Sequence, residues 1–277
     1  MVPLIRRLLR HPQGSIGFVL AVGLILMALA GPWLAPYDPE SMHFASRFAP
    51  PSWEFLLGTD SFGRDLLSRV LVGARSTILL ALLATIIGST VGALIGLISA
   101  YFGGRIDEII MRIVDAVMAI PGLLFALLII SALGSSAINA VIAIGITFAP
   151  GMARVSRSIT LTVREQDYVA AAVARGEGAA WIILREIAPN ILAPVIVEST
   201  IRVAFAIMLL ATLSFLGMGA QPPSPEWGLM ISDARAHLYR SPWPVIAPGV
   251  AIATVAVAFN LLGDGLRDVL NPRVQGG

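Results

Sequence analysis

Six apolar stretches alternate with polar connections along this chain, and they set its predicted architecture. Their residue ranges are 15–35, 78–101, 109–133, 138–152, 191–216 and 243–262. Most approach the ~20 residues that an α-helix needs to span the hydrocarbon core of a bilayer. Pro121 predicts a kink in the third stretch, and Pro150 predicts a break in the short fourth one. The pattern predicts an all-α membrane protein with six transmembrane helices.

The first apolar stretch has two interpretations, a cleaved signal peptide or a retained helix. Arginines precede it, and Ala28-Leu29-Ala30 imitates a signal-peptide cleavage site. The apolar residues continue past that site through Trp33 and Leu34. This continuation favours a retained span.

The second apolar stretch carries a small residue at every fourth position. The set is Ala84, Gly88, Gly92, Gly96 and Ala100. Small residues at this spacing line one face of a helix and let the backbone of a second helix come close within lipid. We expect tight helix packing along this face.

Two spans contain charged residues. Glu198 and Arg202 stand four residues apart within the fifth stretch, and an unpaired charge at mid-bilayer costs about 2.5–3.5 kcal/mol on insertion scales. We therefore expect them to pair and to face protein or water, either as part of the bundle or along a transport pathway. Glu108, Arg112 and Asp115 at the start of the third stretch are expected to neutralise one another.

A long polar segment lies between the fourth and fifth stretches, and its pattern predicts two short helices. Gly176 separates them because glycine can adopt the positive φ that ends a helix, and Pro189 is expected to end the second. Tyr168, Ala171 and Ala172 share a face with little side-chain bulk, which would let a partner's backbone approach. We interpret this face as a docking surface, with a generic amphipathic linker as the alternative.

Composition excludes several classes of function. The chain is 57% hydrophobic and 13% charged, with a mean hydropathy of +0.84, whereas soluble domains are about 25% charged. It has no cysteine, so disulfides and thiolate metal sites are excluded, and all 19 basic residues are arginine. Without lysine it cannot carry a standard ATP-binding phosphate loop. Three scattered histidines predict no metal site, no catalytic motif is visible, and scattered arginines do not predict nucleic-acid binding.

Residues of the polar segment match a known motif. Tyr168-Val-Ala-Ala-Ala172, Gly176 and the Pro189-Asn190 pair resemble the cytoplasmic "EAA" loop of ABC importer permeases, which inserts into the ATPase subunit. The spacing from the glycine to the proline matches, while Ala170 stands where the motif usually has Glu and Ala188 where it usually has Leu. The resemblance assigns ATPase coupling to Tyr168, Ala170, Ala171, Ala172, Gly176 and Pro189.

Two further segments resemble external loops of the importer subfamily for dipeptides, oligopeptides and nickel. They are LGTDSFGRD, which ends at Asp65, and FLGMGAQPPSPEWG, which begins at Phe215. Asp65 is also placed to cap a helix that would lie along the membrane surface. A calcium loop is excluded because Phe62, at the third loop position, cannot ligate. The resemblance implies docking of an external binding protein by Asp60, Arg64, Asp65, Pro222, Pro223, Glu226 and Trp227.

The resemblance covers almost the whole chain and is that of the C-type permease of a bacterial importer. It implies the type I ABC importer permease fold and half of a translocation pathway for dipeptides or oligopeptides. The implied partners are a homologous B-type permease, an extracytoplasmic solute-binding protein, and two ATPase subunits that hold ATP and magnesium. No cofactor or catalytic residue is expected on this chain. Nickel and glutathione are the nearest alternative substrates.

Two other classes of function compete with the importer. A self-sufficient secondary transporter would be expected to show inverted repeats, which are not visible. An intramembrane enzyme would need a nucleophile with a base, or a metal pair, and neither presents itself. We therefore favour the importer subunit.

Arginine distribution predicts the orientation in the membrane. With six spans both termini share one side, which carries 12 arginines against six on the other. Positive residues favour the cytoplasmic side, so both termini are predicted to be cytoplasmic in a bacterial inner membrane. We divide the chain into an N-terminal unit (1–76), a transmembrane domain (77–270) with a cytoplasmic coupling loop (156–190), and a tail (271–277).

Overall fold

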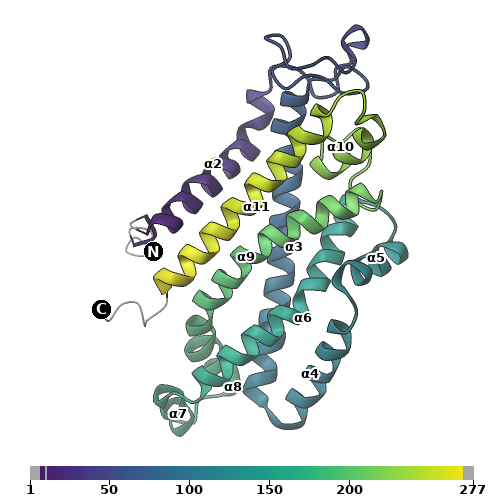
Figure 1. The fold of residues 1–277 in the computed structure, drawn as a ribbon. Helices are drawn as coiled ribbons and strands as arrows, with labels where there is room; N and C mark the ends of the chain where they lie inside the picture. Colours follow the sequence, from purple (N-terminus) through teal and green to yellow (C-terminus); the bar gives the residue numbers. More distant parts are fainter. Residues whose placement is uncertain (1–6, 10, 271–277) are drawn as a thin grey trace.

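A computed structural model describes residues 7–9 and 11–270, which contain helices and loops and no β-strand (Figure 1). The helices follow one another as α2 (Pro12–Leu34), η1 (Phe44–Ser46), α3 (Leu66–Phe102), α4 (Gly104–Met118), α5 (Gly122–Leu133), α6 (Ala137–Arg164), α7 (Asp167–Ala174), α8 (Ala179–Trp181), η2 (Ile182–Ile187), α9 (Ala188–Phe215), α10 (Trp227–Ala234), η3 (Arg235–His237) and α11 (Trp243–Leu270). The all-α prediction is confirmed.

Five of the described helices are long and apolar enough to cross a membrane, counting α8, η2 and α9 as one. The third predicted span, residues 109–133, is not one kinked helix. It consists of α4 and α5, which meet at 91°. Pro121 causes the break, because proline lacks an N–H and disfavours helical geometry at the residue before it. The pair makes a sixth crossing only if it is counted as one broken span.

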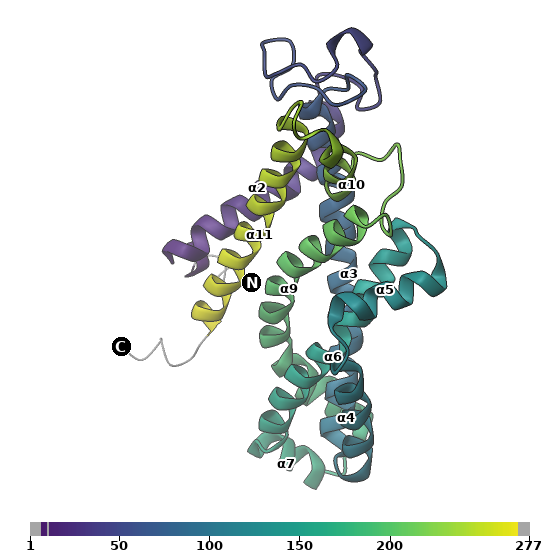
Figure 2. The same cartoon turned by 45° about the vertical axis from the view of Figure 1, so that its right-hand side comes forward.

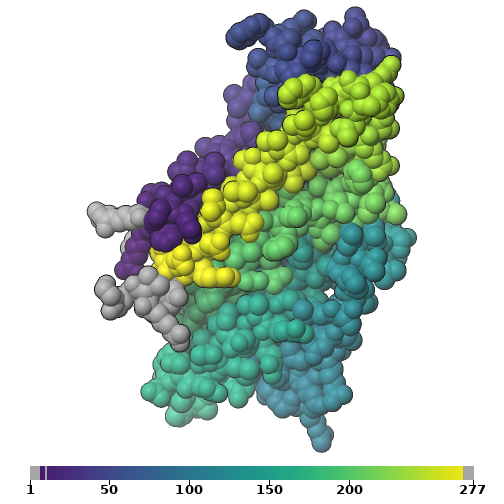
Figure 3. All heavy atoms as spheres, in the orientation of Figure 1, coloured from purple at the N-terminus to yellow at the C-terminus, as the bar shows by residue number. Residues whose placement is uncertain are grey.

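The 37-residue α3 is the axis of the bundle, and α6 packs along much of its length. Helices α2 and α11 lie side by side, with α11 (yellow) between α2 and α9 in Figures 1 and 3. His11 before α2 and Asp268 near the end of α11 approach to 3.5 Å, so these two ends share one side. Figure 2 shows the segment between α2 and α3 at the opposite end from α7.

The glycine face of α3 meets α6 at backbone contact distance. A Cβ added to Gly92 would lie 2.3 Å from the carbonyl oxygen of Ala149, and one added to Gly96 would lie 2.2 Å from that of Ala153. Either distance is a steric overlap, so only glycine allows this approach. The predicted close packing is confirmed.

Three predicted helix boundaries are wrong. Pro150 does not end the fourth span, because α6 runs through it as far as Arg164. Asp65 does cap a helix, accepting a hydrogen bond of 2.7 Å from the Ser68 N–H, but that helix is α3 itself and no separate surface helix exists there. Pro189 does not end the second helix of the polar segment.

A turn of π-helix explains how the chain continues through Pro189. In an α-helix the Pro189 nitrogen would have to donate to Arg185, which proline cannot do. Residues Ile182–Ile187 instead form the wider η2, whose bonding pattern continues with the Ala188 N–H donating to the carbonyl of Ile183. The segment that contains η2 is thereby joined to α9 by continuous helix.

Candidate functional site

The segment formed by α7, α8 and η2 is held to the membrane helices by its own small core. Its buried members are Leu97 of α3, Val169 and Ala172 of α7, Ile182 and Ile187 of η2, and Ile191 of α9. Because four elements contribute to this cluster, the segment is a packed extension of the bundle. The prediction that Ala172 faces a partner is wrong, because its side chain is fully buried here.

The opposite side of this segment is exposed. Tyr168, Ala170, Ala171 and Val173 of α7 are exposed, Val173 to 59%. Leu184 of η2 is 67% exposed. Exposed apolar side chains next to small ones are typical of a protein interaction surface. We call these five residues the α7 surface. Val173 and Leu184 were not predicted, because their exposure depends on how α7 and η2 pack.

Gly176 forms the elbow between the two short helices, as predicted. Its φ is +79°, a conformation that residues with a Cβ rarely adopt, and nothing lies within 4 Å of an added Cβ. The turn is closed by the Glu177 N–H, which donates to the Ala172 carbonyl at 3.2 Å. Pro189 is exposed on the first turn of α9. The backbone conformation therefore sets the requirement for glycine at this elbow.

Charged residues join α4 to α6 near the same end of the bundle. Arg157 donates to Asp107 at 2.6 Å, and Arg154 donates to Asp115 at 2.6 Å. Arg112 donates to Glu108, its neighbour on α4. The predicted neutralisation within the third span is therefore correct for that pair and wrong for Asp115, which pairs across to α6.

Glu198 and Arg202 form the predicted ion pair on α9. The Arg202 Nη2 donates to Glu198 Oε1 at 2.9 Å, and the Arg202 Cζ lies 5.9 Å from the ring centroid of Phe148 on α6. The side chain of Arg202 is 16% exposed and that of Glu198 25%. A Cβ on Gly151 would lie 3.2 Å from Arg202 Nη2, so this glycine makes room for the guanidinium.

The predicted external residues of the LGTDSFGRD segment are buried within the chain. Asp60 accepts hydrogen bonds from the Arg64 N–H and the Arg64 side chain, the latter at 2.6 Å. Arg69, which the sequence did not single out, donates to the carbonyls of Pro39 and Ser224. It therefore ties together the two loops that were predicted to be external. Asp60, Arg64 and Asp65 are placed to shape these loops and do not offer a contact surface.

The second external loop divides into buried and exposed residues. Trp227 is fully buried and its indole Nε1 donates to the Val70 carbonyl at 3.0 Å. Glu226 is also fully buried and caps α10, accepting from the N–H groups of Gly228 and Leu229. Burial raises the pKa of Glu226, and these bonds partly oppose that rise.

Two other predicted residues of this loop, Pro222 and Pro223, are exposed. Asp233 at the end of α10 was not predicted, and burial raises its pKa as well. Asp233 lines a small pocket together with Asp60, Arg64 and Arg69. The positive charges of the two arginines lower the pKa of Asp233 and so oppose the effect of burial.

Comparison with protein families decides the classification. Residues 88–276 match the family described as binding-protein-dependent transport system inner membrane component. The chain belongs to this family. Residues 4–51 also match the N-terminal transmembrane domain of oligopeptide transport permease C. The protein is therefore a C-type permease component of an ABC transport system, with the type I ABC importer permease fold.

Curated relatives match this permease over nearly its full length. It is 42% identical over 272 residues to the di/tripeptide transport system permease protein DppC of Pseudomonas aeruginosa, covering 96% of this chain and 90% of that one. It is 39% identical over 266 residues to the dipeptide transport system permease protein DppC of Haemophilus influenzae, covering 94% and 90%. It is 40% identical over 272 residues to the glutathione transport system permease protein GsiD of Escherichia coli, covering 98% and 90%.

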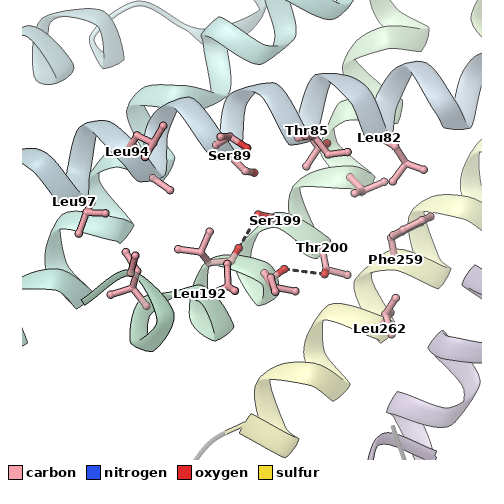
Figure 4. A pocket seen from close by; sticks show the side chains of 18 residues that line it. Leu82, Thr85, Ser89, Leu94, Leu97, Leu192, Ser199, Thr200, Phe259 and Leu262 are labelled. Carbon is pink, nitrogen blue, oxygen red and sulfur yellow. Dashed lines mark hydrogen bonds between the residues drawn. The ribbon is translucent and has the colours of Figure 1, made fainter. Parts of the chain in front are cut away.

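A groove of about 490 Å³ runs between α3, α9 and α11 of the permease (Figure 4). Its lining is mainly aliphatic, with serine and threonine side chains among the apolar ones. Ser199 and Thr200 donate their hydroxyls to carbonyls of their own helix. Ser89 also lines the groove, and its buried hydroxyl has no hydrogen-bond partner among the described residues. No charged side chain lines it. An apolar chain or helix face fits such a groove, whereas a charged solute would lose its hydration there without compensation.

Proposed function

We propose that this permease forms half of the translocation pathway of an ATP-driven importer for dipeptides and short oligopeptides. The substrate class is supported by the relatives from Pseudomonas aeruginosa and Haemophilus influenzae, whose names specify dipeptide or di/tripeptide transport. Glutathione, which the Escherichia coli relative's name specifies, is the alternative and is itself a peptide. ATP and magnesium bind on partner ATPase subunits and not on this chain.

The observation that carries the proposal is the exposed α7 surface on a rigidly held segment. Tyr168, Val173 and Leu184 present apolar area to the outside, while Val169 and Ala172 fix the segment from below. A force applied to this surface by an ATPase reaches α9 through η2 and reaches α3 and α6 through the small core. Such a connection lets nucleotide-driven closure of the ATPases shift the membrane helices between two arrangements.

The complete transporter holds this permease with a homologous B-type permease, two ATPases and an extracytoplasmic solute-binding protein. Both termini and the α7 surface face the cytoplasm, in agreement with the arginine distribution. The external loops, which Arg69 ties together, face the binding protein. Exposed Pro222 and Pro223 offer a stiff contact edge there, while buried Glu226 and Trp227 hold that edge in place.

A charge on the α7 surface tests this assignment. Ala171→Asp places a carboxylate into a contact that would be desolvated by the ATPase, at a cost on the order of several kcal/mol if it is unpaired. Co-purification of the ATPases with the permease is expected to fall at least about tenfold, because 1.4 kcal/mol already corresponds to a factor of ten. Stimulation of ATP hydrolysis by the loaded binding protein should fall with it.

Two comparison variants make the result specific. Ala45→Asp changes an exposed alanine in the external loops and should leave ATPase attachment unchanged. Ala172→Asp buries the charge within the permease itself, so it should loosen the segment and speed trypsin cleavage after exposed Arg175. Wild-type attachment and stimulation in Ala171→Asp would show that this surface does not contact the ATPase.

A further inference from the structure

The Glu198–Arg202 pair lies halfway along a membrane-spanning helix. Arg202 is 14 residues from the start of α9 at Ala188 and 13 from its end at Phe215, or roughly 20 Å from either end at 1.5 Å per residue. Ionised side chains at this depth face the bundle interior or water and mark sites of function more often than not. The pair is therefore the first place to look for contact with a charged solute.

The hydrogen bonding of Arg202 is incomplete. A guanidinium carries five N–H donors, and among the described residues Arg202 makes one side-chain hydrogen bond, to Glu198. Its Nε is buried and has no partner in the described part of the chain. A buried ion pair that served packing alone would need its remaining donors satisfied to offset the loss of hydration. Arg202 thus keeps the capacity to bind a further acceptor.

The pair is open on one side, where 16% of the Arg202 side chain is exposed. On its other side the guanidinium packs into the space beside Gly151, next to the Phe148 ring. Glu198 keeps a quarter of its side chain exposed. Phe205, one turn beyond Arg202, is 57% exposed. One face of α9 therefore presents an anion, a cation and an aromatic ring in succession.

The two charged groups now touch at 2.9 Å, but the positions on α9 from which the two side chains extend are spaced to suit a short zwitterion once the pair separates. Residues four apart on a helix are separated by about 6 Å along its axis. The charged ends of a dipeptide are separated by roughly two residue lengths, about 6–7 Å when extended. A dipeptide lying along α9 can set its ammonium group against Glu198 and its carboxylate against Arg202, where two parallel hydrogen bonds can form.

We propose that Glu198 and Arg202 are a transient binding site for the two charged ends of a peptide in transit. Each side chain exchanges its present partner for one end of the peptide, so charge stays balanced in a medium that tolerates no unpaired ion. The proposal rests on the peptide importer function proposed above. It predicts that the order of the two charges along α9 matters, and not only their presence.

A charge exchange separates this role from a structural one. The double variant Glu198→Arg plus Arg202→Glu keeps an ion pair at the same spacing and reverses its direction. The complete transporter, with its second permease, ATPases and binding protein, is reconstituted in vesicles. Uptake of radiolabelled dialanine and ATP hydrolysis stimulated by the loaded binding protein are both measured. The exchanged variant should hydrolyse ATP within about twofold of wild type while its dialanine uptake falls at least tenfold.

Two further variants calibrate the measurement. Arg202→Lys keeps the cation and should retain more uptake than the exchange. Ser199→Ala, whose hydroxyl bonds only its own helix, should transport as wild type does. If the exchanged variant does not assemble, Glu198→Gln plus Arg202→Gln replaces it, because this double variant removes both charges at similar side-chain volume. Its uptake should also fall at least tenfold with stimulated hydrolysis retained.

The outcomes that overturn the proposal are distinct from failure of the peptide importer function. Wild-type uptake by the exchanged pair would show that the pair only stabilises the bundle. If the exchanged variant does not assemble, wild-type uptake by Glu198→Gln plus Arg202→Gln would overturn the proposal instead. A wild-type transporter that takes up neither dialanine nor glutathione would refute the proposed function itself, whatever the variants do.

Discussion

The contact between α3 and α6 predicts a specific cost for a single added methyl group. Replacing Gly92 with alanine puts a Cβ 2.3 Å from the carbonyl oxygen of Ala149 and 2.7 Å from the Cβ of Met152. Ordinary contacts of a Cβ begin near 3.4 Å. Because the nearer group is backbone, a rotamer change cannot relieve the overlap. The two helices must separate by about 1 Å along their longest contact.

The magnitude follows from two opposing effects. Overpacking of a tightly packed interior costs typically about 1–3 kcal/mol. Alanine is favoured over glycine within a helix by about 1 kcal/mol, which acts in the opposite direction. Gly23→Ala is the matched control, since Gly23 is also helical and nothing lies within 4 Å of its added Cβ. Subtracting the control removes the helix-propensity effect and leaves the overpacking.

Thermal stability of the purified permease complex in detergent measures this difference. A kcal/mol corresponds to roughly 2–4 °C in Tm for a chain of this size class. Gly92→Ala should therefore melt at least about 2 °C below Gly23→Ala, and the ATPases should dissociate at a correspondingly lower temperature, because α6 leads into α7. Equal Tm values for the two variants would refute the backbone contact between α3 and α6.

Three further predictions concern charge. Burial raises the pKa of Glu226 above its usual 4.5, so the stability that Glu226 contributes is full below about pH 4.5 and is lost as pH rises through the higher folded-state pKa. Glu226→Gln should therefore flatten the fall in Tm with rising pH. A pH profile of Tm unchanged from wild type would contradict this prediction. Arg202→Ala should lower the yield of assembled complex more than Glu198→Ala plus Arg202→Ala, because it leaves a carboxylate unpaired; equal yields would indicate that both side chains are hydrated. The purified permease alone, which lacks lysine, should not bind ATP in equilibrium dialysis, and saturable binding would contradict a separate ATPase.

The coupling segment shows where reasoning from spacing stops. The sequence placed Tyr168, Ala171 and Ala172 on one helix face, because helical periodicity relates residues three and four apart. The neighbouring elements decide which of these three residues points into the protein. Leu97 of α3 and Ile182 and Ile187 of η2 bury Ala172. A helix of eight residues has too few positions to define an apolar face without knowledge of its neighbours. The exposed α7 surface therefore includes Val173 and Leu184 and excludes Ala172.

The external loops were misassigned for a related reason. The resemblance to the importer subfamily implied that Asp60 and Arg64 meet an external partner. The tertiary structure closes two loops distant in sequence around Arg69, and the ion pair is enclosed between them. Contacts between residues so far apart along the chain leave no periodic pattern in the sequence.

The sequence by itself determined the features that depend on local physics. Apolar run length located most of the membrane helices, the i, i+4 spacing paired Glu198 with Arg202, and the glycine at 176 marked the elbow, because each depends on backbone geometry over a few residues. Only the tertiary structure decided which helices continue through Pro150 and Pro189, and which partner Asp115 takes. A proline removes one hydrogen bond at a cost of a few kcal/mol, and packing against α3 or a π-helical turn offsets that cost in a way that the local sequence does not encode.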